Sequence, residues 1–222
     1  YNIKNNEISY VNGFHYAYKI SIATLHAKLQ NLGIFYDRKF DCNPNSETIY
    51  FSKGNYVSTH SEILKLIKEN SNVLDLGCND GSVGIMIKNK KKCNVTGVDK
   101  KNYSQCSKLD NFILHNLNEG PPDIDYSKFD YIIMLDVIEH LSDPESFIDR
   151  LKILLSKNER VELFASTPNV AFFLLRLSLF FGLFNYGKRG ILDRTHTRLF
   201  TFSTFSNFFE QSGYKIIMKK GI

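Results

Sequence analysis

The chain has 222 residues, of which 43% are hydrophobic, 14% aromatic and 23% charged, and its formal net charge is +5. These values are ordinary for a globular protein and exclude a chain of extreme composition. The length is most simply that of one domain with a substantial core. The small excess of Lys and Arg does not by itself indicate a nucleic-acid partner, and we expect none.

The cysteines form no C-x-x-C pair, and their spacing is not that of a disulfide framework. They are Cys42, Cys78, Cys93 and Cys106. We therefore predict reduced thiols and a cytoplasmic location. Because the sequence begins at Tyr1 rather than Met, an upstream targeting segment stays open.

Residues 1–57 are predicted to form an N-terminal helical and irregular extension. Apolar residues at helical spacing indicate a first helix with an apolar face, and Gly33 suits its C-terminal cap. Those apolar residues are Phe14, Tyr18, Ile22, Leu25, Leu29 and Leu32. Residues 34–57 are predicted to be irregular, with an Asn-Pro-Asn turn at 43–45.

Residues 58–222 are predicted to form one α/β domain, because apolar strands alternate with helical segments. Strands are predicted at 72–77, 94–99, 110–114, 129–136 and 161–166. Helices are predicted near 58–68, at 81–90 and from Asp143-Pro144-Glu145 to about 156, and a short one follows residue 99. This order predicts a Rossmann-like, doubly wound, mostly parallel sheet with helices on both faces. The chemistry should then lie just after residues 75, 99, 115, 136 and 166, at the carboxyl ends of the strands.

The stretch 171–184 is very apolar, but it is too short for a membrane span and contains Arg176. We predict a helical lid here, within an insertion of about 168–200. The alternative is an apolar surface for a lipid-linked acceptor, a peripheral membrane contact or a dimer partner. A helix near 201–211 and a last strand beginning at 214–218 follow.

Gly77 and Gly81 lie in a loop directly after the first strand, within the run VLDLGCNDGS at 73–82. Their spacing fits neither G-x-G-x-x-G nor the phosphate loop G-x-x-x-x-G-K-[ST]. The run resembles the first motif of class I S-adenosylmethionine-dependent methyltransferases, acid-x-Gly-x-Gly-x-Gly. Asn79 stands at the middle glycine, and Asn is the residue other than Gly that best tolerates a positive φ.

Two further runs strengthen this resemblance. DVIEHLSDP at 136–144 is similar to the D-x-x-E-H-L-x-D-P run of a group that includes ubiquinone-biosynthesis O-methyltransferase-like enzymes. STPNV at 166–170 and GILDRTHTRLFT at 190–201 resemble a bacterial branch that often acts on glycans, sugars or other small molecules. The resemblance covers about residues 58–218 and implies a sheet of the seven-stranded type.

The resemblance implies S-adenosylmethionine as the cofactor and S-adenosylhomocysteine as the product. Asp99 ends the second strand, where a carboxylate can accept both ribose hydroxyls, although it could be a plain surface acid. Asn116 would contact the adenine. The predicted cofactor-binding residues are Asp75, Gly77, Cys78, Asn79, Gly81, Asp99, Lys100, Asn116, Leu117, Asp136 and Val137.

The implied reaction is in-line methyl transfer to an oxygen, or less favourably a nitrogen, of a small-molecule or glycan-type acceptor. His140 and His196 are the candidate bases for the acceptor proton, but each could instead have a packing or loop-bonding role. Substrate contacts are predicted for Arg194, Arg198 and Tyr186.

No metal is expected, because Asp136 lacks a second acid and an Asn at matching positions. Glu139 is expected to orient its loop or to point to solvent.

Two rival functions remain open. A nucleic-acid methyltransferase would be favoured by a basic stripe with interleaved aromatic residues, which the sequence does not plainly contain. A protein that binds the cofactor without catalysis, as a partner or sensor, is suggested only by Asn79. The oligomeric state is left open.

Overall fold

The computed structural model describes residues 13–31, 36–37, 59–156 and 160–221. Its contacts divide the chain into two compact units. The sheet unit comprises Ile49–Phe172 and Thr195–Ile222, and the helical unit comprises Tyr1–Thr48 and Phe173–Arg194. The predicted boundary between residues 57 and 58 lies outside the described residues.

The sheet unit contains a parallel sheet of five strands in the order β3-β2-β1-β4-β5. The strands are β1 (Asn72–Leu76), β2 (Asn94–Asp99), β3 (Asn111–Leu114), β4 (Tyr131–Leu135) and β5 (Glu162–Ser166). The strand order reverses between β1 and β4, which is the place where open α/β sheets bind ligands. The predicted fold class is therefore confirmed, with five strands in place of a seven-stranded sheet.

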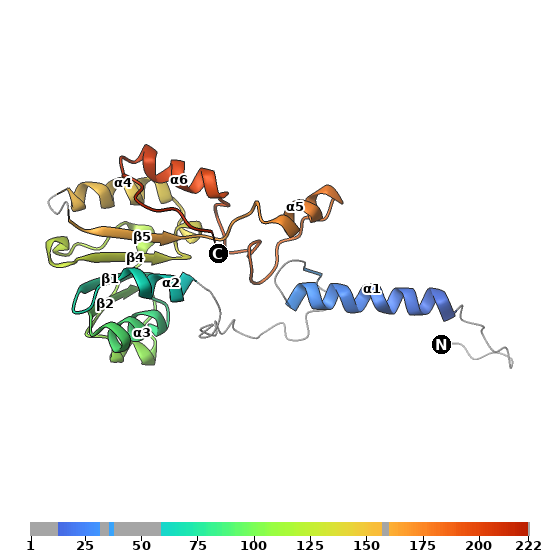
Figure 1. Cartoon of the computed structure of the whole chain (residues 1–222), viewed down its shortest axis with the longest axis horizontal. Coiled ribbons are helices and arrows are strands. Elements are labelled where there is room, and N and C mark those ends of the chain that lie inside the picture. The colour runs from blue at the N-terminus through green and yellow to red at the C-terminus, as the bar shows by residue number, and fades with distance from the viewer. Residues whose placement is uncertain (1–12, 32–35, 38–58, 157–159, 222) are drawn as a thin grey trace. The chain divides into compact units, whose positions relative to one another are not determined.

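Helices cover both faces of this sheet (Figure 1). They are α2 (Thr59–Leu66), α3 (Ser82–Lys91), α4 (Pro144–Leu155) and α6 (Phe202–Gln211). The connections after β2, β3 and β4 contain short 3₁₀ helices. These are η2 (Ser104–Lys108), η3 (Leu117–Glu119), η4 (Tyr126–Lys128) and η5 (Ile138–His140).

Two apolar cores lie on the opposite faces, because successive strand residues point to opposite sides. On β1, Val73 packs with the core of α2 and α3, whereas Leu74 and Leu76 pack with the core of α4 and α6. All three side chains are fully buried, and each contributes about 1.5–3 kcal/mol. Among the buried residues of β1, Asp75 is the polar one, and its environment is described with the functional site.

The helix starts follow the residues that favour them. Asp143 caps α4 by accepting from the Ser146 N–H at 3.1 Å, with Pro144 in the first turn, as predicted. Thr201 and Thr204 form a reciprocal capping box at the start of α6. These caps stabilise the N-termini of α4 and α6, the two helices that cover one face of the sheet.

The predicted last strand at 214–218 is wrong. Within the described residues this segment pairs with no strand, and Ile217 and Met218 are 81% and 60% exposed. Tyr214 instead turns back onto α4, where its hydroxyl donates to the Ile148 carbonyl at 3.3 Å. An apolar run becomes a strand only where a neighbouring strand offers hydrogen bonds.

The helical unit contains α1 (Gly13–Asn31) and α5 (Phe173–Phe180). The predicted first helix is present, but Tyr18 and Leu25 on its apolar face are 64% and 55% exposed. Gly33 and the turn at 43–45 lie outside the described residues.

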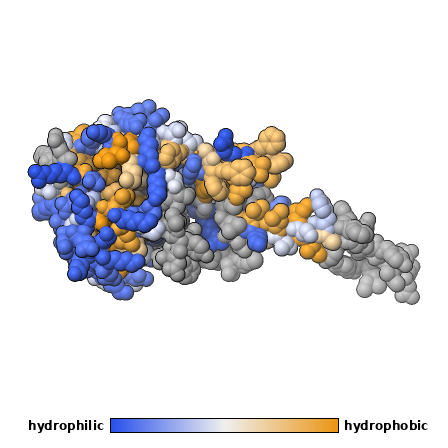
Figure 2. All heavy atoms as spheres, viewed as in Figure 1, coloured by the Kyte–Doolittle hydropathy of each residue, from blue (hydrophilic) through white to orange (hydrophobic). Residues whose placement is uncertain are grey.

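The helix α5 is shorter than the predicted 171–184, and hydrophobic side chains gather on its surface (Figure 2). Among the described residues, no helix has both the length and the apolar character needed to cross a membrane.

Candidate functional site

The loop after β1 has a backbone that only a few residue types can adopt. Gly77 has φ 80°, and a Cβ at this position would lie 2.5 Å from a methyl group of Val137. Asn79 has φ 49°, the left-handed value that its residue type tolerates. Gly81, with φ 79°, caps α3. The loop therefore approaches the chain that follows β4 more closely than any side chain at residue 77 would allow.

Asp99 ties this loop to the end of β2. Its Oδ2 accepts from the Asn79 N–H at 2.9 Å, and its Oδ1 accepts from the Lys101 N–H at 3.0 Å. Each carboxylate oxygen has more than one lone pair, so both retain the capacity to accept from a ligand. Lys100 beside it is exposed.

Asp75 is a buried carboxylate in the middle of β1, with 3% of its surface exposed. Among the described residues, its Oδ2 has no hydrogen-bond partner. Burial, with a smaller contribution from the charge of Asp99, raises the pKa of Asp75 to about 7. A buried acceptor without a partner is costly, and this one suits a cationic or N–H group of a bound cofactor.

Two cysteines lie beneath the loop. Cys78 is buried, and this burial raises the pKa of its thiol well above the usual range. The Cys106 thiol donates to the Asn79 carbonyl at 3.3 Å. The three described cysteines are free thiols, and Cys42 lies outside the described residues. Cys78 and Cys106 thus pack beneath the loop and support it.

The residues after β3 have mixed environments. Asn116 is half-buried, and its side-chain oxygen accepts from the Asn118 N–H at 3.2 Å. Leu117 is buried in the core of α4 and α6. A ligand at this edge would meet the amide of Asn116, because Leu117 faces inward.

The end of β4 is joined to the end of β5 through Asp136. This residue is exposed, has φ 56°, and accepts from the Ser166 hydroxyl at 2.7 Å. Its N–H donates back to Ser166 at 3.1 Å. Ser166 was not predicted as a site residue, because 30 residues separate it from Asp136. The only sequence signal was its place at a strand end.

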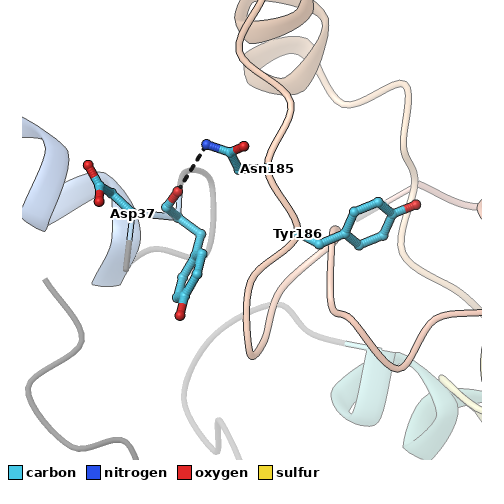
Figure 3. A pocket seen from close by; sticks show the side chains of 4 residues that line it. Asp37, Asn185 and Tyr186 are labelled. Carbon is cyan, nitrogen blue, oxygen red and sulfur yellow. Dashed lines mark hydrogen bonds between the residues drawn. The ribbon is translucent and has the colours of Figure 1, made fainter. Parts of the chain in front are cut away.

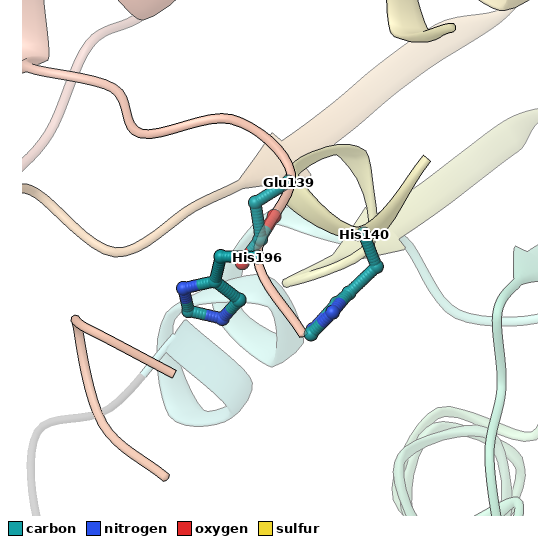
Figure 4. A group of neighbouring side chains, drawn as sticks. All are labelled: Glu139, His140 and His196. Carbon is teal, nitrogen blue, oxygen red and sulfur yellow. The ribbon is translucent and has the colours of Figure 1, made fainter. Parts of the chain in front are cut away.

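His140 and His196 lie side by side, with ring centroids 4.7 Å apart and ring planes at 67° (Figure 4). His140 lies on η5, whereas His196 comes from the chain just before α6. Both belong to the sheet unit. The two predicted catalytic residues therefore lie in contact with each other.

Thr197 holds these two segments together. Its N–H donates to the Glu139 carbonyl at 2.7 Å, and its hydroxyl is 3.0 Å from that carbonyl and 2.5 Å from the Leu141 carbonyl. The separation of 58 residues explains why no local sequence pattern indicated the contact. The Thr197 contacts therefore help to place His196 beside η5.

The hydrogen bonds of His140 indicate its tautomer. Its Nδ1 lies 3.2 Å from the Thr195 carbonyl and 3.1 Å from the Thr195 hydroxyl. When the ring donates to this carbonyl, which can only accept, Nδ1 carries the hydrogen and Nε2 carries the basic lone pair.

Glu139 is buried beneath the histidines, with 1% of its surface exposed, so the expectation that it points to solvent is wrong. Neither carboxylate oxygen has a hydrogen-bond partner among the described residues. Burial is the main cause that raises its pKa to about 8, and the Asp136 charge adds to the rise. The Glu139 backbone N–H and the Thr167 hydroxyl are close enough to oppose the rise, although neither meets hydrogen-bond geometry with the carboxylate.

The predicted substrate residues are distributed over both units. In the sheet unit, the Arg198 guanidinium pairs with Glu145 at 2.7 Å, and both side chains are about half exposed. Arg194 and Tyr186 belong to the helical unit.

Tyr186 is one of the residues that line a concavity within the helical unit (Figure 3). The others are Tyr36, Asp37 and Asn185, and the Asn185 amide donates to the Tyr36 carbonyl at 3.3 Å. The Tyr186 ring points away from Asn185 and Asp37.

Comparison with known proteins finds one family. The sequence model of the methyltransferase domain matches residues 51–219. A curated relative, pavine N-methyltransferase of Thalictrum flavum subsp. glaucum, is 31% identical over 102 residues. This match covers 41% of the chain and 28% of that protein.

A solved structure shares the fold. A SAM-dependent methyltransferase of Archaeoglobus fulgidus superposes with a TM-score of 0.51 at 16% identity, over 70% of this chain and 66% of that one. The 1,6-didemethyltoxoflavin-N1-methyltransferase of Burkholderia thailandensis, solved with S-adenosylhomocysteine, has a TM-score of 0.35 at 20% identity. The match covers 43% of this chain and 45% of the Burkholderia chain.

Proposed function

Because this chain belongs to the methyltransferase-domain family, we propose that it transfers a methyl group to an oxygen, or less favourably a nitrogen, of a small-molecule or sugar-like acceptor. S-adenosylmethionine is the cofactor of this domain. One arrangement carries the proposal. The loop after β1 and the histidine pair after β4 both lie at the carboxyl ends of neighbouring strands, where the strand order reverses.

The residues around the loop after β1 fit the cofactor. Asp99 offers two carboxylate oxygens to ribose hydroxyls, and Asn116 offers its amide to the adenine. Asp75 offers to a cationic group a buried oxygen that has no hydrogen-bond partner in the described part of the chain. The remaining proposed contacts come from Gly77, Cys78, Asn79, Gly81, Lys100, Leu117, Asp136 and Val137. When bound, the cofactor supplies a methyl group that is already activated on a sulfonium.

The chain's own task is then to position the acceptor and to handle its proton. Nε2 of His140 has the lone pair that can accept this proton, and His196 lies in contact with the same ring. Arg198, Arg194 and Tyr186 are proposed to contact the acceptor. The Arg198 guanidinium has donors beyond the one that it gives to Glu145.

The alternative of a protein that binds the cofactor without catalysis was suggested by Asn79. This residue has a left-handed backbone, as its type tolerates, and its N–H donates to Asp99. We propose a cytoplasmic location, because the spacing of the cysteines in the sequence is not that of a disulfide framework. The acceptor class rests on the sequence resemblance, and we propose no nucleic-acid partner.

Calorimetric titration with S-adenosylmethionine and S-adenosylhomocysteine, followed by a mass-spectrometric screen of sugar and small-molecule acceptors, tests the function. We expect micromolar binding of both ligands and a mass gain on one acceptor class. Binding without methyl transfer to any acceptor would favour the sensor alternative. Binding of neither ligand would contradict the proposal.

Replacement of His140 or His196 by Ala is expected to lower kcat about 10²-fold or more. The affinity for S-adenosylhomocysteine should change little, because neither imidazole is among the proposed cofactor contacts. Steady-state kinetics and calorimetry on the same preparations measure the two effects. His115→Ala is the control, since this ring bonds the Gly120 carbonyl at 2.8 Å outside the cluster. Full turnover in both single variants would show that neither ring handles the proton.

A further inference from the structure

We propose that Glu139, His140 and His196 bind a divalent cation of the Zn²⁺ type. One ligand atom from each residue lies within 4.8 Å of the others. Figure 4 shows Glu139 and His140 extending from η5 and His196 approaching from the separate segment before α6. The sequence predicted no metal, because Asp136, the one ligand considered there, lacks a second acid and an Asn at matching positions.

The buried carboxylate is the strongest part of the argument. Glu139 is 1% exposed, and neither of its oxygens makes a hydrogen bond of good geometry among the described residues, although the Thr167 hydroxyl lies nearby. Keeping a carboxylate buried without a partner costs several kcal/mol in an apolar surrounding. A cation between Glu139 and the two imidazoles would offset this cost directly.

The ligand types select the class of cation. Two imidazole nitrogens and one carboxylate oxygen are a common set for Zn²⁺ with one open position. Mg²⁺ and Ca²⁺ prefer oxygen ligands throughout. Zinc bonds of about 2.0–2.2 Å place ligand atoms roughly 3.4 Å apart, so the spread of up to 4.8 Å closes by small side-chain rotations.

The surrounding hydrogen bonds orient the ligands, as outer contacts commonly do in metal sites. The Thr195 carbonyl faces Nδ1 of His140 at 3.2 Å and leaves Nε2 as the ligand atom. Thr197 fixes the segment of His196 through the Glu139 and Leu141 carbonyls. The cluster is thereby held on both sides by backbone contacts.

The chemical consequence rests on the proposed function, whereas cation binding does not. A fourth, open position would bind the acceptor oxygen and lower the pKa of its hydroxyl, so that the hydroxyl proton would leave to solvent water before methyl transfer. The two histidines would then act as ligands instead of bases. Their replacement would stop turnover in either case, so activity alone does not distinguish the two roles.

The test is metal titration of the whole chain, stripped with a chelator and kept free of cofactor. Co²⁺ is added while the visible absorption is followed, and Zn²⁺ binding is measured by calorimetry. We expect one ion per chain, a tetrahedral cobalt spectrum and no thiolate charge-transfer band, because no cysteine belongs to the cluster.

Glu139→Gln and His196→Gln should each weaken Zn²⁺ binding at least tenfold, whereas His115→Gln should bind as the parent chain does. Circular dichroism checks that each variant is folded, and the nearly isosteric Glu139→Gln keeps the test valid if a histidine variant unfolds.

Three results would overturn the proposal: no bound ion, a thiolate band, or parental affinity in both cluster variants. A chain that binds Zn²⁺ but fails to bind S-adenosylhomocysteine would contradict the proposed function and leave the cation site standing.

Discussion

Asp99 shows how one side chain serves a loop and a strand together. Its carboxylate accepts the Asn79 N–H and the Lys101 N–H, so it shapes the loop in addition to its proposed role as the ribose acceptor. Charge-assisted hydrogen bonds of this kind are about twice as strong as neutral ones. Removal of this side chain should therefore lower the affinity for the cofactor more than it lowers the stability of the fold.

Asp99→Ala is expected to weaken the binding of S-adenosylhomocysteine at least tenfold, since it removes the ribose acceptor and releases the loop. Calorimetry measures the affinity, and thermal unfolding checks the fold. Asp130→Ala is a matched control, because Asp130 also accepts a backbone N–H, that of Asn72 at 2.8 Å, at the start of β1 and away from the loop. Equal affinity in both variants would refute the ribose assignment.

The buried carboxyl of Asp75 makes stability depend on pH. Its folded pKa of about 7 lies above the usual 3.8, so its contribution is complete below about pH 4 and is lost as the pH rises through about 7. Asp75→Asn should therefore gain free energy of unfolding relative to the parent chain between pH 5 and pH 8, by about 1 kcal/mol or more.

Urea unfolding at several pH values measures this gain, in the absence of cofactor. Asp149→Asn, at an exposed position on α4, should show a constant difference across the same range. A constant difference for Asp75→Asn as well would mean that its carboxyl titrates normally in the folded chain.

At the level of elements, sequence periodicity predicted every strand of the sheet within about two residues. It worked because a parallel strand buried on both faces is a continuous apolar run that ends in a polar loop. It failed at 214–218, where the same kind of run has no strand beside it.

The site was predictable only in part, for a similar reason. Asp99 and Asn79 lie at strand ends and turns, which local patterns indicate. Ser166, Thr197 and the burial of Glu139 depend on contacts across 30 and 58 residues. No period in the sequence encodes such contacts, so they become visible only in the folded chain.

Thr197→Val is expected to loosen the joint between the two histidine segments, because its hydroxyl is in contact with two carbonyls. We predict a loss of about 1–2 kcal/mol in the free energy of unfolding and a fall in kcat. Thr204→Val is the matched control, since it removes the α6 capping box and costs about 1 kcal/mol without touching the cluster. A fall in kcat in both variants would mean that turnover follows stability alone.

At the scale of the whole molecule, the segment from α5 to Tyr186 presents apolar side chains to solvent. Phe173, Phe180 and Phe181 are 69%, 83% and 66% exposed. Between residues 171 and 192 the sequence has Arg176, Lys188 and Arg189 but no acid. Apolar side chains beside positive charge are typical of a contact with an anionic lipid surface.

We therefore expect the chain to sediment with vesicles that contain anionic phospholipid, and much less with zwitterionic vesicles. The double variant Phe180→Ser/Phe181→Ser should reduce this binding severalfold. Ile153→Ser is the control, because Ile153 on α4 is 69% exposed outside this segment. Equal binding to both kinds of vesicle would exclude the charge contribution, and a dimer that the double variant dissociates would identify a second copy as the partner.

The segment 173–194 leaves and re-enters the sheet unit at neighbouring points. The Val170 N–H donates to the Phe200 carbonyl at 2.8 Å, and Asn169 pairs with Phe200. Joining the two ends of a loop already accounts for most of its entropy cost, and further length adds little. A segment with this anchoring can be lengthened, shortened or exchanged at little entropic cost to the sheet unit that carries it.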